Sequence, residues 1–262
     1  MRLWFSVLIM AAVAVAGSGC NLEEMASGAR FQEEFRHHHD FQAGGRLAVE
    51  NFDGPIEITG WDRDEVEITG TKHASSKDLL AALDVDVVAT TGFIQVRTVR
   101  PSGRRGSAGA SSAIRAPRRI ALDRIITSNG GVSVSDIEGE VRLRTSNGRI
   151  RIQGLEGNAE AETSNGGIEV LESSGSARVS TSNGRIKLEG VRGDLQARTS
   201  NGGIEARLCG GGNGPITLNT SNGGITLHLD EPPRGDITAG ASNASITVHA
   251  PAGLAVNLEA ST

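Results

Sequence analysis

The sequence predicts an all-β fold, a parallel β-helix or β-solenoid with 18-residue rungs. Three observations support this prediction: a Thr-Ser-Asn-Gly motif recurs at a fixed spacing, apolar and polar residues alternate within each repeat, and the composition is unusual. The chain has 35 glycines, no tyrosine and only 3% aromatic residues. Abundant glycine with few aromatic residues suits a regular β-structure with many turns better than a helical domain.

The repeat is visible as a series of asparagines that each precede a corner. Self-similarity at a fixed period is the signature of a repeat architecture. The first five asparagines recur with an 18-residue period and the last two follow at 21-residue steps, so seven rungs are expected. These residues are Asn129, Asn147, Asn165, Asn183, Asn201, Asn222 and Asn243. Because stacked rungs place identical residues above one another, we expect the asparagines to form a hydrogen-bonded ladder along one edge.

Within one repeat, apolar residues alternate with polar ones in two short segments. Ile168 and Val170 mark the first segment, and Ala177 and Val179 mark the second. This is the period of a half-buried β-strand. The Asn-Gly corner and a second glycine ten residues after the asparagine, such as Gly175, would supply positive-φ turns between the strands.

An antiparallel meander is the alternative, because Asn-Gly between alternating strands is also the strongest hairpin signal. The charges favour the coil. At two repeat positions the sign of the charge changes at each 18-residue step: Arg151, Glu169, Lys187 and Glu205 at one, and Arg142, Glu160 and Arg178 at the other. Stacking would place opposite charges side by side, and each rung of a coil depends on its neighbours for a core.

The chain before the repeats is also β-rich. Strands are expected near residues 47–49, 56–58, 66–68, 85–88 and 93–99. A short helix is expected over residues 76–83, with Ser76 as its N-cap. The mature chain therefore divides into an N-terminal β segment with a basic loop, residues 41–124, and a repeat solenoid continuous with it, residues 125–262.

The first residues predict export. Arg2 precedes an apolar run over residues 3–16, which is shorter than the roughly 20 residues that a membrane-spanning helix needs. This pattern is typical of a cleaved signal peptide, here residues 1–19. Small residues then lead to Cys20, which resembles a lipobox cysteine that is acylated and becomes the mature N-terminus. An ordinary secretory signal is the alternative, because Gly17 stands where the lipobox usually has leucine.

Lipidation would make residues 20–40 a tether to the membrane and place the protein in the cell envelope. Asn21 follows the cysteine, and some bacteria use aspartate there for retention in the inner membrane. We therefore expect the outer membrane. Loss of Arg2 with the signal peptide changes the formal charge from −5 to −6, spread along the chain, so no nucleic-acid partner is expected.

Residues 97–124 form the one basic feature, with eight arginines and a single acid, Asp123. We expect Arg104, Arg105, Arg118 and Arg119 to be available to an anionic partner, namely lipid headgroups, lipopolysaccharide phosphates or an acidic glycan. The alternative is a flexible solvated loop that joins two β segments.

No metal, cofactor or disulfide is expected. Cys209 falls where other repeats have an apolar residue, which indicates a buried thiol. Residues 37–39 are three consecutive histidines in the expected tether, and consecutive residues of an extended chain cannot converge on one ion. His73, His228 and His249 are isolated. The corners also lack the recurring aspartate of calcium-binding repeats, so we expect a calcium-independent solenoid.

No catalytic site is expected either. The candidates for a paired-carboxylate site of the glycosidase kind are Glu160, Glu162, Glu169, Glu172 and Glu205. Their positions in the repeat make them outward members of the charge series. An enzyme would be expected to break its repeat where the site lies, and no such break is found.

The stretch NFDGPIEITGWDRDEVEI followed by many TSNG-Ile units resembles the bacterial putative-adhesin β-strand-repeat domains of unknown function, over residues 41–250. The resemblance implies a β-helical, often membrane-anchored envelope domain without established catalytic residues. We therefore expect a non-enzymatic, lipid-anchored scaffold or binding protein, whose partners are the membrane and an envelope glycan or protein. Two alternatives stay open: a carbohydrate-active β-helix enzyme, and an envelope-stress accessory protein that acts through a protein partner.

Overall fold

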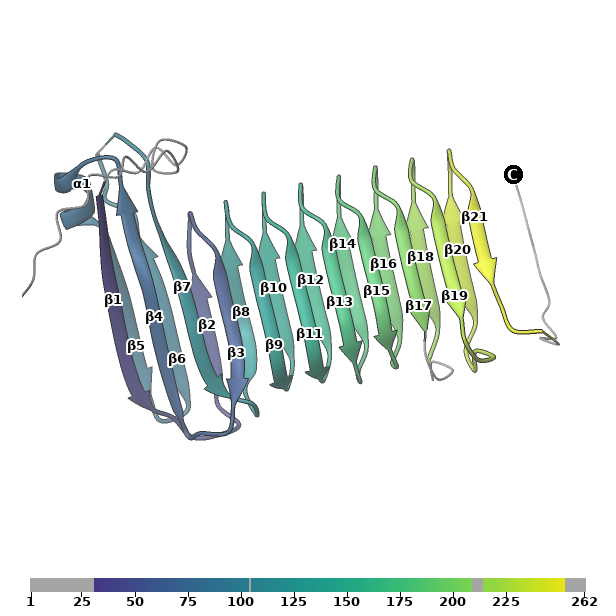
Figure 1. Ribbon diagram of the computed structural model, residues 1–262, viewed down its shortest axis with the longest axis horizontal. Helices are drawn as coiled ribbons and strands as arrows, with labels where there is room; N and C mark the ends of the chain where they lie inside the picture. The colour runs from purple at the N-terminus through teal and green to yellow at the C-terminus, as the bar shows by residue number, and fades with distance from the viewer. Residues whose placement is uncertain (1–30, 104, 209–213, 253–262) are drawn as a thin grey trace, which may run out of the picture.

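The structure is a computed structural model that describes residues 31–103, 105–208 and 214–252. These residues form two long sheets and one short helix (Figure 1). The N-terminal part contains β1 (Phe31–Asp40), β2 (Arg46–Glu50), β3 (Ile56–Trp61), β4 (Glu65–Ala74), α1 (Lys77–Ala82), β5 (Asp84–Thr90), β6 (Phe93–Val99), β7 (Ala108–Pro117) and β8 (Ala121–Thr127). The repeats contain β9 (Val132–Glu138), β10 (Val141–Thr145), β11 (Ile150–Glu156), β12 (Ala159–Thr163), β13 (Ile168–Ser173), β14 (Ala177–Thr181), β15 (Ile186–Val191), β16 (Leu195–Thr199), β17 (Ile204–Leu208), β18 (Ile216–Thr220), β19 (Ile225–Leu229), β20 (Ile237–Ala241) and β21 (Ile246–His249).

The repeats form a parallel β-solenoid, as predicted, and not a meander. From β9 onward, odd-numbered strands lie in an eleven-stranded sheet, here sheet A, and even-numbered strands lie in a ten-stranded sheet, here sheet B. Ile150 is aligned with Ile168 and Ile168 with Ile186, so each rung stacks on the equivalent residues of the last. The inward apolar residues, such as Ile152 and Val170, are fully buried between the sheets. Burial of this kind stabilises by about 1.5–3 kcal/mol per side chain.

The Thr-Ser-Asn-Gly corner is held by a buried threonine. Thr163 Oγ1 donates to the carbonyl oxygen of Gly148 in the preceding rung at 3.0 Å, and accepts from the backbone N–H of Gly166 at 3.3 Å. Thr181 makes the same two bonds to Gly166 and Gly184. Each hydroxyl thus satisfies polar backbone groups that would otherwise be buried without partners.

The glycine of this corner is required by close stacking, and the prediction of a positive-φ turn there is wrong. None of these corner glycines in the repeats has a positive φ. A Cβ on Gly166 would lie 1.7 Å from the carbonyl oxygen of Gly148, and a Cβ on Gly148 would lie 1.8 Å from that of Gly130. Only glycine lets consecutive corners approach so closely.

Positive φ angles occur elsewhere, again at an 18-residue spacing. They lie seven residues after the asparagine, at Asp136 (57°), Gly154 (64°), Glu172 (56°) and Gly190 (71°). Among the second glycines, Gly139 and Gly157 have the predicted positive φ, at 157° and 153°, whereas Gly175 and Gly193 do not. The sharp left-handed position of the rung is therefore held alternately by an acidic residue and by glycine.

The N-terminal part does not stack in chain order. β2 pairs in parallel with β6 on one side and β8 on the other, and β3 lies between β7 and β9. The rung formed by β2 and β3 is therefore inserted between the rung of β6 and β7 and the rung of β8 and β9. Its corner, Asn51 to Gly54, is aligned with the first repeat corner, since Asp53 bridges to Asn129.

The expected helix and flanking strands are confirmed, but part of the expected tether is not a tether. α1 is capped by Ser76, whose Oγ accepts from the backbone N–H of Leu79 at 3.2 Å. Residues 31–40 form β1, which pairs antiparallel with the whole of β4 (Figure 1). The rest of the tether, the signal peptide, Cys20, Arg104 and Cys209 lie outside the described residues. In the described part of the chain, no helix has the length and hydropathy to cross a bilayer.

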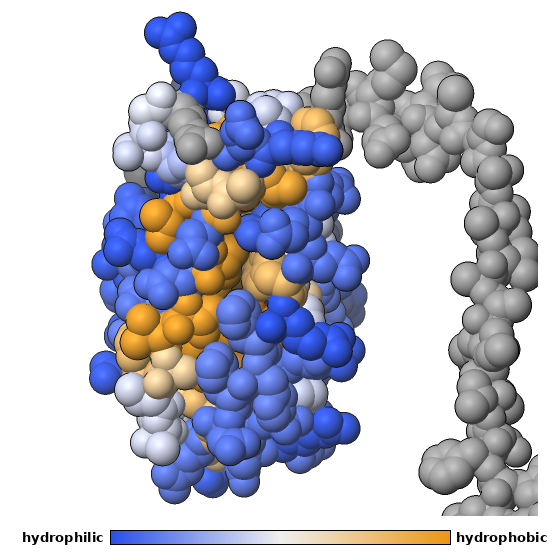
Figure 2. Space-filling view, turned by 90° about the vertical axis from the view of Figure 1, so that its left-hand side faces the viewer, coloured by the Kyte–Doolittle hydropathy of each residue, from blue (hydrophilic) through white to orange (hydrophobic). Residues whose placement is uncertain are grey.

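Figure 2 looks at the N-terminal end of the solenoid, where apolar surface runs down the middle between polar borders. β1 and β5 are the outermost strands of sheets A and B at this end. The partly buried Phe35 and Val87 pack there against the main core, and Val88 is 47% exposed. At the other end, Val248 on β21 is 50% exposed.

Candidate functional site

The seven asparagines of the repeat form one continuous ladder on the surface. Each Nδ2 donates to the Oδ1 of the asparagine one rung earlier, in six bonds of 2.7–2.9 Å that join Asn129, Asn147, Asn165, Asn183, Asn201, Asn222 and Asn243. Side-chain bonds of this length are strong neutral hydrogen bonds. The ladder gives one edge of the solenoid a regular row of amide groups along its whole length.

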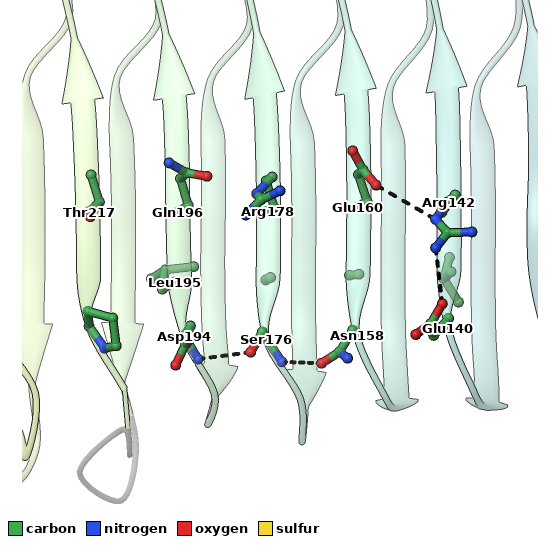
Figure 3. A pocket seen from close by; sticks show the side chains of 14 residues that line it. Glu140, Arg142, Asn158, Glu160, Ser176, Arg178, Asp194, Leu195, Gln196 and Thr217 are labelled. Carbon is green, nitrogen blue, oxygen red and sulfur yellow. Dashed lines mark hydrogen bonds and ion pairs between the residues drawn. The ribbon is translucent and has the colours of Figure 1, made fainter.

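A shallow hollow of about 380 Å³ lies across the outer face of sheet B (Figure 3). It is lined by equivalent positions of β10, β12, β14, β16 and β18 and of the corners that precede them. Polar groups follow one another there from rung to rung. Asn158 Oδ1 accepts from the backbone N–H of Ser176 at 2.9 Å, and Ser176 Oγ accepts from that of Asp194 at 3.2 Å. Arg178 and Gln196 lie above this row on their strands (Figure 3).

The acidic residues considered for catalysis lie on outward positions, several of them beside arginines. Glu169 Oε2 is 2.7 Å from Arg151 Nη1, an ion pair between rungs. The other close pairs are Glu160 with Arg142 at 3.8 Å and Glu162 with Arg144 at 3.5 Å. Glu205 is in register with Lys187. Glu172 lies near the end of β13, at the position with positive φ. The structure thus distributes these acids along the charge series and does not gather them around one point.

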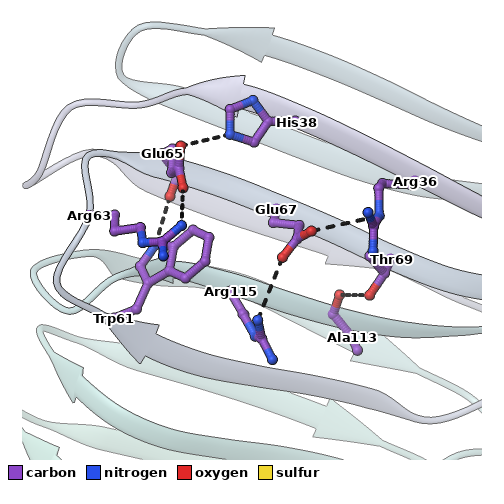
Figure 4. Close-up of polar contacts among 9 residues, drawn as sticks. All are labelled: Arg36, His38, Trp61, Arg63, Glu65, Glu67, Thr69, Ala113 and Arg115. Atoms are coloured by element: carbon purple, nitrogen blue, oxygen red, sulfur yellow. Dashed lines mark hydrogen bonds and ion pairs between the residues drawn. The ribbon is translucent and has the colours of Figure 1, made fainter. Parts of the chain in front are cut away.

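A second polar cluster lies on β4, where the strand contacts β1 and β7 (Figure 4). Glu65 is bound by His38 Nε2 at 2.7 Å and by Arg63 Nη1 at 3.1 Å. These hydrogen bonds, from His38 first and Arg63 second, lower the pKa of the Glu65 carboxyl below its ordinary value. Trp61 completes the cluster, because its Nε1 donates to the Glu65 carbonyl oxygen at 2.9 Å and the Arg63 guanidinium lies 5.0 Å from its ring.

The arginines singled out in the basic segment do not form one site. Arg118 binds Asp62 at 2.8 Å and lies 3.8 Å from Asp136. The hydrogen bond to Asp62 raises the pKa of the Arg118 guanidinium. Arg105 and Arg119 lie at different places, before β7 and before β8. Most of the expected basic loop is in fact strand, since β7 and β8 account for much of it.

Three other arginines of the same segment do come together. Arg97 and Arg124 both approach Glu50, with Nε–Oε distances of 3.7 and 3.2 Å. The guanidinium of Arg100 lies 5.5 Å from the centre of the Phe52 ring. All five residues line a hollow of about 490 Å³ on the outer face of sheet B. Sequence reasoning missed this group because its members come from three strands that are neighbours only through the inserted rung.

The histidines do not make a metal site in the described residues, where no group of three potential ligands is found. His37 and His39 stack with their ring centres 6.4 Å apart on β1, while His38 points to the other side and binds Glu65. His228 and His249 stack at 4.4 Å on consecutive rungs. These histidines therefore extend the stacking pattern of the strands.

The repeat and the inserted rung can now be compared with known proteins. The sequence profile of the family described as Toastrack DUF4097, a domain of unknown function, matches residues 42–259. The chain belongs to this family. Its expected resemblance to adhesin-type repeat domains is confirmed by this match and by the structural neighbours of this Toastrack chain. A comparison with curated proteins finds no match.

Several solved structures are similar to the Toastrack chain. A protein from Bacteroides fragilis NCTC 9343, described as a putative adhesin, has a TM-score of 0.51 at 13% identity and covers 82% of this chain and 97% of its own. One from Parabacteroides distasonis ATCC 8503, described as a putative lipid binding protein, gives 0.47 at 15% identity, with 82% and 96% covered. A putative adhesin from Parabacteroides merdae ATCC 43184 gives 0.44 at 7% identity, with 82% and 95% covered. At 13% identity, the likeness to the Bacteroides fragilis protein shows a shared fold.

Proposed function

We propose that this Toastrack chain is a non-enzymatic, lipid-anchored protein of the cell envelope whose solenoid is a binding or scaffold surface for a repetitive polar partner. The observation that carries the proposal is the hollow of sheet B, where equivalent polar residues recur from rung to rung without a break (Figure 3). Stacked strands are about 4.8 Å apart, so such a surface presents polar side chains at a regular spacing, here Arg142, Glu160, Arg178, Gln196 and Thr217. A polymer with repeated polar units can match several rungs at once.

The chemistry of the surface favours an envelope glycan as this polymer. The hollow offers amide, hydroxyl, carboxylate and guanidinium groups, and its lining residues include no aromatic side chain. Hydrogen bonding to sugar hydroxyls would therefore contribute more than ring stacking. The name adhesin carried by the Bacteroides fragilis protein fits a role of this kind. A non-catalytic role fits the placing of Glu160, Glu162 and Glu169 beside arginines, in ion pairs that continue the charge series from rung to rung.

The anchor and the exposed face are tested in cells. Intact and permeabilised cells that express the full chain are treated with protease, alongside cells that express Cys20→Ala. We expect the wild-type chain in the membrane fraction and the variant in the soluble fraction, because acylation at Cys20 would hold the protein in the envelope. Equal membrane association of both chains would contradict the anchor. Digestion on intact cells supports surface display, and protection until permeabilisation points to periplasmic polymers.

The binding surface is tested by co-sedimentation of the purified chain with isolated envelope polysaccharide. We expect Arg178→Ala combined with Gln196→Ala to reduce binding about tenfold, since each lost polar contact contributes about 0.5–1.5 kcal/mol. Lys187→Ala combined with Thr226→Ala, on the outer face of sheet A, is the matched control and should bind normally. Equal binding by both double variants would contradict the assignment of the hollow. A single dominant crosslinked protein in place of a glycan would favour the accessory-protein alternative.

A further inference from the structure

The arginines around Glu50 lie at the end of the molecule where the described chain begins. Phe52, the residue under the Arg100 guanidinium, packs against a small core separate from the main one. Phe31, the first residue of β1, packs against the same core. This small core consists of Ala74, Leu79, Leu80, Leu83 and Ala108. The hollow is therefore close to the point at which any N-terminal anchor would join the solenoid.

The length of chain before Phe31 limits how far this end can be from a membrane. Eleven steps of the chain separate Cys20 from Phe31, because 31 − 20 = 11. A fully extended chain covers at most about 3.3–3.6 Å per residue, or roughly 40 Å in all. On the proposed lipid anchor at Cys20, on which this inference rests, the N-terminal end stays within that distance of the bilayer surface. Figure 1 shows α1 beside the start of β1 at this end.

The charge of the hollow differs from that of the chain as a whole. Its lining contains three arginines and one carboxylate, a formal charge of +2, while the mature chain would carry −6. An anionic bilayer repels the acidic solenoid and attracts this face. Each basic residue close to such a surface contributes about 1 kcal/mol of attraction, which falls off within a Debye length of roughly 10 Å.

The arginines are also free to rearrange around an anion. Their ion pairs with Glu50 are exposed, since the side chains of Arg97 and Arg124 are 61% and 62% accessible. Exposed ion pairs of this kind contribute little to stability, so an incoming phosphate competes with Glu50 at low cost. Guanidinium groups bind phosphate oxygens in a bidentate manner. The stacking of Arg100 on Phe52 holds the third guanidinium near the other two.

We infer that the hollow lined by Arg97, Arg100 and Arg124 binds the phosphate of an anionic lipid headgroup and so orients the solenoid on its membrane. An acyl chain alone limits only the distance between the domain and the bilayer. The arginine contact adds an orientation, with the N-terminal part of the outer face of sheet B turned toward the lipid. Membrane association of a singly or doubly acylated protein is strengthened by a basic patch of this kind.

The test uses the full mature chain with Cys20→Ser, so that no acyl group contributes. Binding is measured by sedimentation with vesicles of phosphatidylcholine and with vesicles in which phosphatidylglycerol is added. We expect binding only to the second kind, weakened by salt. Arg97→Gln, Arg100→Gln and Arg124→Gln together should reduce it by roughly tenfold or more. Glu50→Gln should increase it several-fold, because the competing carboxylate is removed.

The matched control changes three exposed arginines of the repeats, Arg144, Arg149 and Arg198, to glutamine, with the same change of net charge. This variant should bind within about twofold of the parent chain. Equal losses for the two triple variants, or no gain with Glu50→Gln, would overturn the inference. Titration with inorganic phosphate is the second arm of the test. If the hollow binds phosphate while all variants bind vesicles equally, it is a site for a free anion and not for a lipid headgroup.

A folding control accompanies the vesicle assay. Thermal unfolding monitored by circular dichroism shows whether each triple variant is folded, and Arg100→Gln alone serves if the triple variant is not. The vesicle assay does not depend on acylation in the cell. If the wild-type chain is not acylated at Cys20 in the cell while the Cys20→Ser chain binds anionic vesicles through these arginines, the proposed anchor is contradicted and the arginine site is not.

Discussion

The repeats and the inserted rung of β2 and β3 form the same kind of corner with different side chains. In the repeats, Thr163 reaches one carbonyl oxygen of the preceding rung, that of Gly148. In the inserted rung the equivalent residue is Asn51, whose Nδ2 donates to the carbonyl oxygens of Gly54 at 3.1 Å and Ala110 at 2.6 Å. The longer amide bridges its own corner and β7, which is distant in the chain.

This difference between the two corners follows from the segments on which each rung stacks. A repeat rung stacks on a copy of itself, so one short hydroxyl at a fixed position is sufficient. The inserted rung stacks on two dissimilar segments, β7 and β9, and needs a side chain that reaches both a local and a distant backbone group. Four predictions test the comparison, in order of decreasing effect.

The largest effect is expected where corners of the repeat touch. Gly223→Ala would place a Cβ 1.9 Å from the carbonyl oxygen of Gly202, so the rung must shift, at a cost of about 3 kcal/mol in unfolding free energy. Gly224→Ala is the matched control, because its Cβ would lie 3.5 Å from the nearest atom, an ordinary contact. Urea unfolding of both variants measures the difference. Equal stability of the two would contradict the close-stacking explanation.

The second effect compares the two corners directly. Asn51→Leu keeps the branched shape of a buried side chain but removes donors to two carbonyl oxygens and the acceptor for the backbone N–H of Asp53, and we expect it to cost about 2 kcal/mol. Thr163→Val removes one donor to Gly148 and one acceptor for Gly166, and about 1 kcal/mol is expected. The measurement is again urea unfolding. A larger cost for Thr163→Val would reverse the comparison between the inserted rung and the repeats.

A third, smaller effect concerns the left-handed position of the rung. Glu172→Gly should stabilise the protein by about 0.5 kcal/mol, since relief of left-handed strain, about 1–2 kcal/mol, exceeds the entropic cost of glycine. Gly154 and Gly190 already occupy this position in adjacent rungs. Glu156→Gly, at an exposed strand position, is the control and should destabilise by roughly 0.5–1 kcal/mol. Thermal unfolding of both variants measures these changes in stability. A loss of stability in Glu172→Gly would refute the strain argument.

The smallest effect is the pH dependence of the N-terminal part. The folded protein lowers the pKa of Glu65, so its ion pairs stabilise above the ordinary pKa of about 4.5 and are lost as the pH falls through the lowered value. We expect wild type to be more stable than Glu65→Gln at pH 7, and the difference to shrink as the pH falls below about 4.5 and Glu65 becomes protonated. Urea unfolding across this range measures it, with Glu57→Gln on β3 as control. A difference in unfolding free energy that does not shrink as the pH falls would assign the effect to packing.

The repeat region could be predicted well because it is local and periodic. The spacing of the asparagines fixed which residues stack, and alternation fixed which side chains face the core, as Ile168 and Val170 do. The helix cap at Ser76 is a local signal of the same kind. Glycine at the corner was also expected, but as a turn residue. The structure shows that it is required by contact with the carbonyl oxygen of the preceding rung, which the sequence of a single rung cannot reveal.

The N-terminal part could be predicted only in pieces. Its strands were found by alternation, but the insertion of the β2–β3 rung depends on pairing with β8 and β9, which lie far along the chain beyond four intervening strands and a helix. The one sequence signal of the inserted rung was the Asn-x-Asp-Gly spacing at Asn51, which matches the Thr-x-Asn-Gly spacing of the repeat corners. β1 was not predicted because its run of polar histidines does not look like a strand. In the structure it pairs with β4 along one edge.

The sequence by itself determined the rung, its period and the order of the repeats, because each rung repeats the same residues and stacks on a copy of itself. The tertiary structure alone decided how the N-terminal strands are shuffled, why the corner needs glycine, and which arginines meet around Glu50. These features depend on contacts between segments with unlike sequences. Periodicity carries no information about such contacts, since they are fixed only when the separate strands share one core.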